Sequence, residues 1–105
     1  MRKRRLVFSD AAIADILDQF DWYSAQSGKR LAGRWQKEAT SLVTLIVSRP
    51  AVGARCKFRS PELQDVRRMA VPGFPKHLLF YRFDDEEVFV LRVVHDARDL
   101  ERLFS

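Results

Sequence analysis

The chain has 105 residues and a formal net charge of +5, which is enough for one hydrophobic core but not for two, and we expect a single domain over residues 1–105. Hydrophobic residues make up 47% of the sequence and charged residues 31%, a balance that excludes disorder as the main state. Cys56 is the single cysteine, which excludes an internal disulfide and favours a reducing, cytoplasmic location. Asp10 and Asp15 interrupt the N-terminal apolar run, and no run approaches the roughly 18 apolar residues that cross a bilayer, so we expect no targeting or membrane segment.

The first half of the chain predicts one strand followed by two helices. Residues 4–9 form a short apolar run, after which Ser9 stands at an N-cap position and Asp10 in the first helical turn. The helix predicted from there to Gly28 has its apolar stripe on Ile13, Ile16, Leu17, Phe20 and Ser24, with Asp15, Asp18 and Asp21 off that stripe. A second helix is predicted over residues 29–48, with an apolar face of Leu31, Trp35, Ala39, Leu42, Val43 and Ile46. The short link makes the two helices an antiparallel hairpin.

The second half predicts an antiparallel β-meander. Residues 50–64 contain two prolines and one glycine without a period, which indicates a loop. Strands are predicted over 65–71, 76–83 and 87–94, joined by short turns, and the last is apolar on both faces, which indicates a central position. A short C-terminal helix over 97–104 would place Leu100, Leu103 and Phe104 on one face. The expected fold is α+β, in the order βααβββα, with the helical hairpin packed on a mainly antiparallel four-stranded sheet.

The C-terminal half also resembles a known family. The stretch HLLFYR at 77–82, an acidic turn, and VLRVVHDARDLERLF at 90–104 resemble the end of the RelE/ParE toxin superfamily, specifically its ParE-like branch. The resemblance implies the toxin of a bacterial type II toxin-antitoxin system. It further implies that the toxin inhibits DNA gyrase by protein binding, without catalysis or a cofactor. A cognate ParD-like antitoxin would neutralise it, and contact with DNA would come only through the antitoxin complex.

A RelE-like toxin, which cleaves mRNA on the ribosome, is the alternative that the same superfamily offers. Cleavage by a ribose 2′-hydroxyl needs a base, an acid and cations on the phosphate. The residues available for these roles are Arg67, Arg68, His77 and Arg82. However, Leu78 stands where RelE-like toxins have an arginine, no tyrosine follows Tyr81, and Phe104 cannot transfer a proton. These departures favour the gyrase-binding interpretation.

The polar cluster at the end of the last strand has two possible roles. His95, Asp96, Arg98 and Asp99 would form either an ion-paired network or part of a surface that engages the target. In the first case Arg82 or Arg92, each within an apolar strand, would pair with Asp96 or Asp99, because an unpaired buried charge is costly. In the second case the target-binding residues would be Arg82, Arg92, His95, Arg98 and Asp99.

Two further sets of residues bear on partners. Lys and Arg outnumber Asp and Glu by 12 to 5 over residues 1–59 but not over 60–105, where the numbers are 7 and 9. This basic half would attract an acidic antitoxin segment or, in a third interpretation, nucleic acid, for which the RKRR stretch at 2–5 is a candidate contact. The antitoxin-binding candidates are Trp22, Tyr23, Arg34 and Lys37. Trp35 is expected in the core, Cys56 has no base beside it that would make it a nucleophile, and no metal site is expected.

Overall fold

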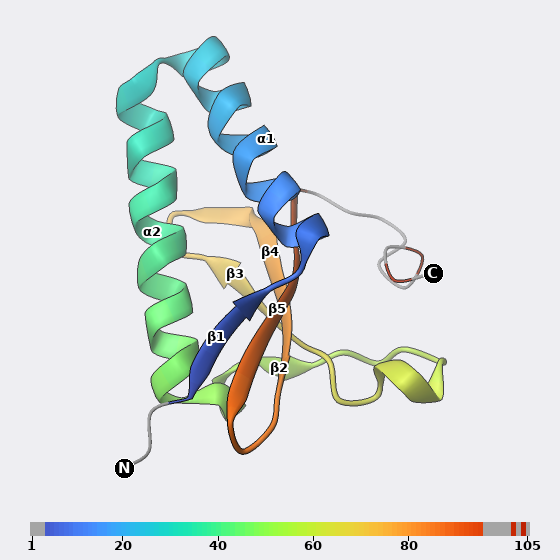
Figure 1. Ribbon diagram of the computed structural model, residues 1–105. Helices are drawn as coiled ribbons and strands as arrows, with labels where there is room; N and C mark the ends of the chain where they lie inside the picture. The colour runs from blue at the N-terminus through green and yellow to red at the C-terminus, as the bar shows by residue number, and fades with distance from the viewer. Residues whose placement is uncertain (1–3, 96–101, 103, 105) are drawn as a thin grey trace.

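The computed structural model describes residues 4–95, 102 and 104. Its described part is an α+β fold in which two long helices cover one face of a five-stranded sheet (Figure 1). The helices are α1 (Asp10–Ser27) and α2 (Lys29–Ser48), and the strands are β1 (Arg5–Phe8), β2 (Ala54–Arg55), β3 (Arg67–Val71), β4 (Phe74–Phe83) and β5 (Glu87–His95). The strand order is β1-β5-β4-β3-β2.

The helical hairpin forms as the sequence predicts. The Ser9 hydroxyl accepts a hydrogen bond from the Ala12 N–H at 2.9 Å, so it caps α1. Gly28 alone links the two helices, at φ 86°, a value that favours glycine. The α2 face from Ala32 to Ile46 is buried as expected, including Trp35.

The buried face of α1 differs from the predicted stripe. Ile13 and Leu17 are 46% and 59% exposed, whereas Ala12 and Tyr23 are buried. Asp15, expected on the solvent side, lies against the sheet and pairs with Arg92. The prediction was right for Ile16 and Phe20, which pack against the core, and wrong for Ile13 and Leu17. α1 lies beside β5 near the edge of the sheet, and the contact of Asp15 with β5 turns the helix so that these two residues face solvent.

The sheet has one more strand than expected and is mainly antiparallel as predicted, with one parallel pair that involves its first strand. The two-residue β2, flanked by 3₁₀ turns at Pro50–Val52 and Pro61–Leu63, lies in the segment predicted as loop. β3, β4 and β5 form the expected antiparallel meander, and β5 is an interior strand between β1 and β4, with which it pairs in parallel and antiparallel fashion respectively. No turn connects β1 to β5, so local sequence carried no signal for their relative direction.

Apolar residues pack on both faces of the sheet. The larger core lies under the helices and includes Trp35, Leu79, Tyr81 and Val90. A smaller core on the opposite face gathers Cys56, Val66 and Phe80, with Phe104 packed against it. The predicted C-terminal helix over 97–104 lies outside the described residues except for Arg102 and Phe104.

Candidate functional site

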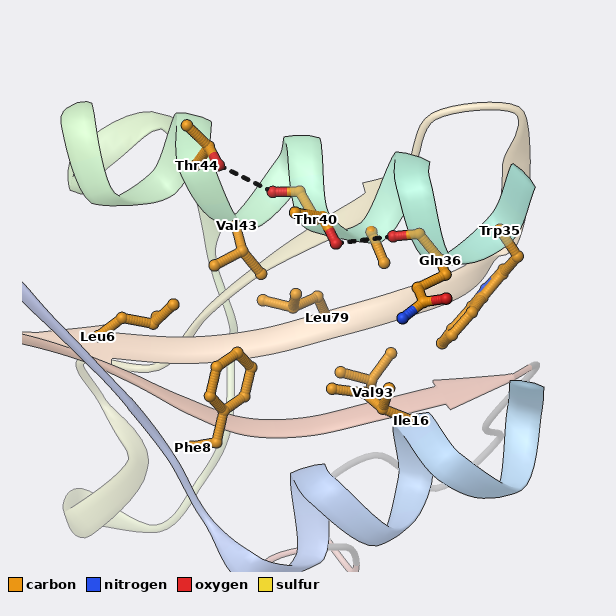
Figure 2. Close-up of a pocket in the computed structure, with 11 residues that line it drawn as sticks. Leu6, Phe8, Ile16, Trp35, Gln36, Thr40, Val43, Thr44, Leu79 and Val93 are labelled. Carbon is orange, nitrogen blue, oxygen red and sulfur yellow. Dashed lines mark hydrogen bonds between the residues drawn. The ribbon is translucent and has the colours of Figure 1, made fainter. Parts of the chain in front are cut away.

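An apolar groove opens between α2, α1 and β1 on the helical side of the sheet (Figure 2). Its volume is about 360 Å³. Leu79 and Val93 form its floor from the sheet, while Ile16 and Phe8 lie on one side and α2 on the other. The complete lining is Leu6, Phe8, Ile16, Trp35, Gln36, Ala39, Thr40, Val43, Thr44, Leu79 and Val93.

The two threonine hydroxyls on the α2 side of the groove are satisfied within the helix, whereas the Trp35 Nε1–H is buried without a hydrogen-bond partner in the part of the chain that the structure describes. The Thr40 hydroxyl donates to the Gln36 carbonyl at 2.8 Å, and the Thr44 hydroxyl donates to the Thr40 carbonyl at 3.0 Å (Figure 2). Because these hydroxyls donate within the helix, they need no hydrogen-bond acceptor from a ligand. The groove suits the apolar face of an amphipathic segment better than a charged small molecule.

The groove borders an edge strand. β1 ends the sheet on this side, and among the described residues only β5 pairs with it. Leu6, on β1, lines the groove and is 39% exposed. An extended or helical peptide could thus meet both an apolar surface and unpaired backbone groups at one place.

A partly buried ion pair between Asp15 and Arg92 holds α1 against β5. Asp15 Oδ2 accepts hydrogen bonds from Arg92 Nε at 2.7 Å and from the Val93 N–H at 3.0 Å, and Arg92 Nη2 donates to Oδ1 at 2.9 Å. The hydrogen bond to Asp15 raises the pKa of Arg92. Sequence reasoning missed this contact because the two residues are 77 positions apart and no periodic signal joins them.

His77 lies in a pocket of aromatic rings beneath the hairpin. It is 1% exposed, its Nε2 is 2.7 Å from the Tyr23 hydroxyl, and its ring contacts those of Trp35 and Phe74. Burial, assisted by the neighbouring His95, lowers the pKa of His77 to about 4. The ring is therefore neutral at neutral pH.

The four ribonuclease candidates do not form one cluster. Side chains alternate along β4, so His77 faces the helices while Arg82 faces the opposite side of the sheet. Arg67 pairs with Tyr81, which is four residues and about 13 Å along β4 from His77. Arg68 pairs with Phe80 on the other face.

Two of these arginines already serve the loops. Arg67 Nη1 donates to the carbonyls of Ala51 and Gly53, and Arg82 Nη2 donates to the Glu62 carbonyl and to Asp65 at 2.6 Å. Since His77 is enclosed, no base and phosphate-binding cation share an open surface in this set.

The proposed target-binding residues have separate environments. Arg92 pairs with Asp15 and Arg82 with Asp65, pairings that the sequence analysis did not anticipate. His95 is exposed and lines a cavity of about 320 Å³ with Gln19 and Trp22. Asp96, Arg98 and Asp99 lie outside the described residues.

The antitoxin-binding candidates lie at the hairpin tip and along α2, apart from the groove. Trp22 is 54% exposed, and Arg34 and Lys37 are exposed, but Tyr23 is 9% exposed and turned toward His77. The sequence analysis assigned the groove residues to the core or gave them no role. The groove itself depends on the pairing of β1 with β5, which the sequence did not predict. The one sequence signal of the groove residues is the row of small and polar residues on α2 at Ala39, Thr40 and Thr44.

The surroundings of Cys56 do not favour a reactive thiol. Cys56 is buried against Val66 and Phe80, and burial raises the pKa of its thiol, which disfavours the nucleophilic thiolate. Within residues 4–95, 102 and 104, no group of three or more His, Cys, Asp or Glu side chains could hold a metal ion. Over the same residues, no helix is both long and apolar enough to cross a membrane.

A family comparison identifies the chain. The family described as the ParE toxin of the type II toxin-antitoxin system, parDE, matches residues 6–100. The chain belongs to the ParE toxin family. No match was found among curated proteins.

Solved structures share the fold of this ParE-family chain at low sequence identity. A chromosomal ParDE TA system from P. aeruginosa has a TM-score of 0.73 and 19% identity, covering 90% of this chain and 98% of its own. The YoeB dimer from Staphylococcus aureus has a TM-score of 0.61 and 18% identity, covering 90% and 98%. The E. coli DinJ-YafQ toxin-antitoxin complex has a TM-score of 0.61 and 13% identity, covering 90% and 93%. At these identities the likeness shows the fold alone.

Proposed function

We propose that this ParE-family toxin acts by binding DNA gyrase and inhibiting it, without catalysis. The observation that carries the proposal is the separation of the ribonuclease candidates on β3 and β4. His77 is enclosed and neutral, Arg67 and Arg82 are held by loop carbonyls, and Arg68 lies on the opposite face from His77. Cleavage of RNA needs an acid, a base and a cation together at one phosphate.

We further propose that the cognate antitoxin, of ParD type, occupies the apolar groove with a segment that folds on binding. The groove is mainly apolar, the Thr40 and Thr44 hydroxyls at its rim are satisfied within α2, and it borders β1, which among the described residues pairs only with β5. The basic excess in the N-terminal half would attract an acidic antitoxin segment to the same part of the molecule. Two fold neighbours, the ParDE TA system and the DinJ-YafQ toxin-antitoxin complex, are toxin-antitoxin assemblies and support a partner of this class.

Expression in bacterial cells without the antitoxin tests the target. We expect filamentation and an SOS response while bulk mRNA stays intact, because a poisoned gyrase damages DNA and leaves transcripts alone. In vitro, the purified chain should reduce supercoiling by gyrase. Rapid mRNA cleavage that requires ribosomes, with gyrase unaffected, would overturn this proposal in favour of the RelE-like alternative.

A further inference from the structure

Two arginines stand directly opposite each other at the edge of the sheet that lies farthest from β1. Arg55 on β2 and Arg67 on β3 are register partners in an antiparallel pair, so their side chains project from the same face of the sheet. Like charges in this position repel each other and destabilise the pairing. A charge on the edge strand protects it from pairing with another chain, but that role does not require a second charge on β3.

Neither of these two positive charges has a carboxylate partner. Arg67 Nη1 donates to the carbonyls of Ala51 and Gly53 at 3.2 and 2.7 Å. Arg55 Nη2 donates to the Gln64 carbonyl at 3.0 Å. In the part of the chain that the structure describes, neither arginine forms an ion pair. A guanidinium has five N–H donors, so most of the donors of both side chains remain available to a ligand.

The two arginines line one cavity, which gives a ligand access to both. This cavity has a volume of about 180 Å³ and is lined by Arg55, Asp65, Arg67 and Phe83. The guanidinium carbon of Arg67 lies 5.8 Å from the centroid of the Phe83 ring, a cation–π contact that helps to fix its position. Because Arg55 is exposed and Arg67 only partly buried, the cavity can be reached from solvent.

The charge at the cavity is positive even though Asp65 lines it. Asp65 Oδ1 accepts a hydrogen bond from Arg82 Nη2 at 2.6 Å, so its charge is matched by an arginine outside the lining. Among the described residues, Asp65 is the only acidic residue that lines the cavity. The positive charges of Arg55 and Arg67 are therefore left for an anion.

We propose that Arg55 and Arg67 form a binding site for a phosphate group, supplied either as free phosphate or as a phosphodiester of nucleic acid. A guanidinium presents its N–H groups in a planar fork that matches phosphate oxygens, and an anion between the two side chains relieves their repulsion. The cavity shares no described lining residue with the apolar groove. The site is thus independent of the proposed antitoxin contact and of gyrase inhibition.

Titration with inorganic phosphate at constant ionic strength, followed by nuclear magnetic resonance, tests the site. The side-chain Nε–H resonances of Arg55 and Arg67 should shift together and give one dissociation constant. Arg55→Gln should bind phosphate roughly tenfold more weakly, the loss expected for one charge-assisted hydrogen bond. Arg68→Gln is the matched control, because Arg68 is exposed and follows Arg67 on β3, so its side chain lies on the other face of the sheet. Thermal melts confirm that both variants fold.

The carboxylate in the cavity gives a second test with the opposite sign. Asp65→Asn removes the one negative charge of the described lining and should make phosphate binding several-fold tighter. Asp18→Asn produces the same change in net charge on an exposed part of α1 and should leave phosphate binding unchanged. Equal effects of the two variants would mean that only the net charge matters, which would overturn the proposal.

A short thymidine oligonucleotide distinguishes the two sources of the phosphate group. If the site takes phosphodiesters, Arg55→Gln should weaken oligonucleotide binding more than Arg68→Gln does. If it takes free phosphate, the two variants should bind the oligonucleotide equally and differ only with inorganic phosphate. Equal losses in both variants with both probes would overturn the proposal, and so would the absence of any shift at Arg55 and Arg67.

Discussion

At the scale of single residues, three polar side chains, two of them buried and one partly buried, fix the positions of distant segments. Tyr81 Oη accepts a hydrogen bond from the Gly53 N–H at 2.8 Å and donates to the Pro50 carbonyl at 2.7 Å, which holds the start of the loop after α2 against β4. His77 joins β4 to α1 through Tyr23. Asp15 does the same for α1 and β5. Each of these side chains makes a hydrogen bond within the protein at a position shielded from water, where a polar group without a partner would cost free energy.

The low pKa of His77 predicts a loss of stability in acid. The pKa of His77 is about 4 in the folded chain and 6.5 in the unfolded chain, so the unfolded state binds more protons between these two pH values. Stability from this group is therefore fully present above about pH 6.5 and falls as the pH drops toward 4, by roughly 3 kcal/mol in all. Tyr23 and His95 are the titratable groups that face His77.

Urea unfolding at several pH values between 7 and 4 measures this loss. His77→Phe keeps an aromatic ring in the pocket and removes the titration, so its free energy of unfolding should depend less on pH in this window. The same dependence in the parent and in His77→Phe would show that other groups cause the acid sensitivity.

Tyr81→Phe should lower the free energy of unfolding by about 1 to 3 kcal/mol, because it leaves the buried Gly53 N–H and the Pro50 carbonyl unpaired. A Cβ at Gly53 would lie 2.5 Å from Tyr81 Oη, so Gly53→Ala should be destabilising too. Thermal or urea melts of both single variants and the double variant measure the coupling. We expect Gly53→Ala to cost less in the Tyr81→Phe background, since the clash with the hydroxyl is gone; strictly additive costs would contradict the contact.

At the scale of elements, the start of α1 makes hydrogen bonds to the part of β5 that extends beyond its pairing with β1. β1 pairs with Glu87–Val90 and then ends, while β5 continues to His95. From that point the Ser9 hydroxyl donates to the Leu91 carbonyl at 2.7 Å, and Asp15 accepts from the Val93 N–H. The N-terminal turns of the helix therefore act in place of a longer strand.

Asp15→Asn should destabilise the chain by about 1.5 to 3 kcal/mol, the range for a hydrogen bond to a charged group, because the amide cannot neutralise the half-buried Arg92. Asp18→Asn is the matched control on the same helix, since Asp18 is exposed and should change stability by no more than about 0.5 kcal/mol. Denaturant unfolding of both variants at neutral pH provides the comparison. Equal effects would mean that α1 does not depend on this pair.

If the antitoxin binds in the groove, charged substitutions at two adjacent residues of α2, Thr40 and Ser41, should affect antitoxin binding differently. Thr40→Glu places a charge at the groove, whereas Ser41→Glu places the same charge on an exposed part of α2 that does not line it. If the antitoxin docks in the groove, Thr40→Glu should weaken binding at least tenfold and Ser41→Glu should have little effect, because a charge facing an apolar partner loses its hydration. Binding assays with the purified antitoxin, with melts to confirm folding, test this. Equal affinities would move the antitoxin to another surface.

At the scale of the whole molecule, the net charge of +5 is a property of association and not of fold. Its basic half includes the hairpin and β1, next to the groove. A long-range field of this sign attracts acidic protein segments and nucleic acid alike. Salt dependence separates the two partners, because phosphate contacts release counterions.

We expect the isolated chain to bind DNA only weakly, with a Kd of about 10 μM or weaker near physiological salt, in the usual non-specific range. Gel-shift or fluorescence-anisotropy titrations at 50 and 200 mM salt measure it. A DNA-binding module with six or more phosphate contacts would instead lose roughly a thousandfold in affinity over that range. A nanomolar, sequence-selective complex in the absence of antitoxin would refute the view that DNA is reached only through the antitoxin complex.

The sequence by itself determined the elements that depend on near neighbours. The Ser9 cap, the one-glycine link at Gly28, the buried face of α2 with Trp35, and the β3–β4–β5 meander all follow from helical and strand periods and from turn residues. Each of these features depends on residues that lie within a few positions of one another in the sequence. The family resemblance at the C-terminal end was readable for the same reason, since it rests on contiguous stretches.

Only the tertiary structure decided which distant segments meet. The parallel pairing of β1 with β5, the rotation of α1 that buries Asp15 and exposes Leu17, and the contact of His77 with His95 each depend on register or on packing across the sheet. The apolar groove arises from the same choices, because its walls come from β1, both helices and two sheet strands. Periodicity says which residues share a face, but the partner of that face is set by the free energy of the whole assembled core, to which segments far apart in sequence contribute together.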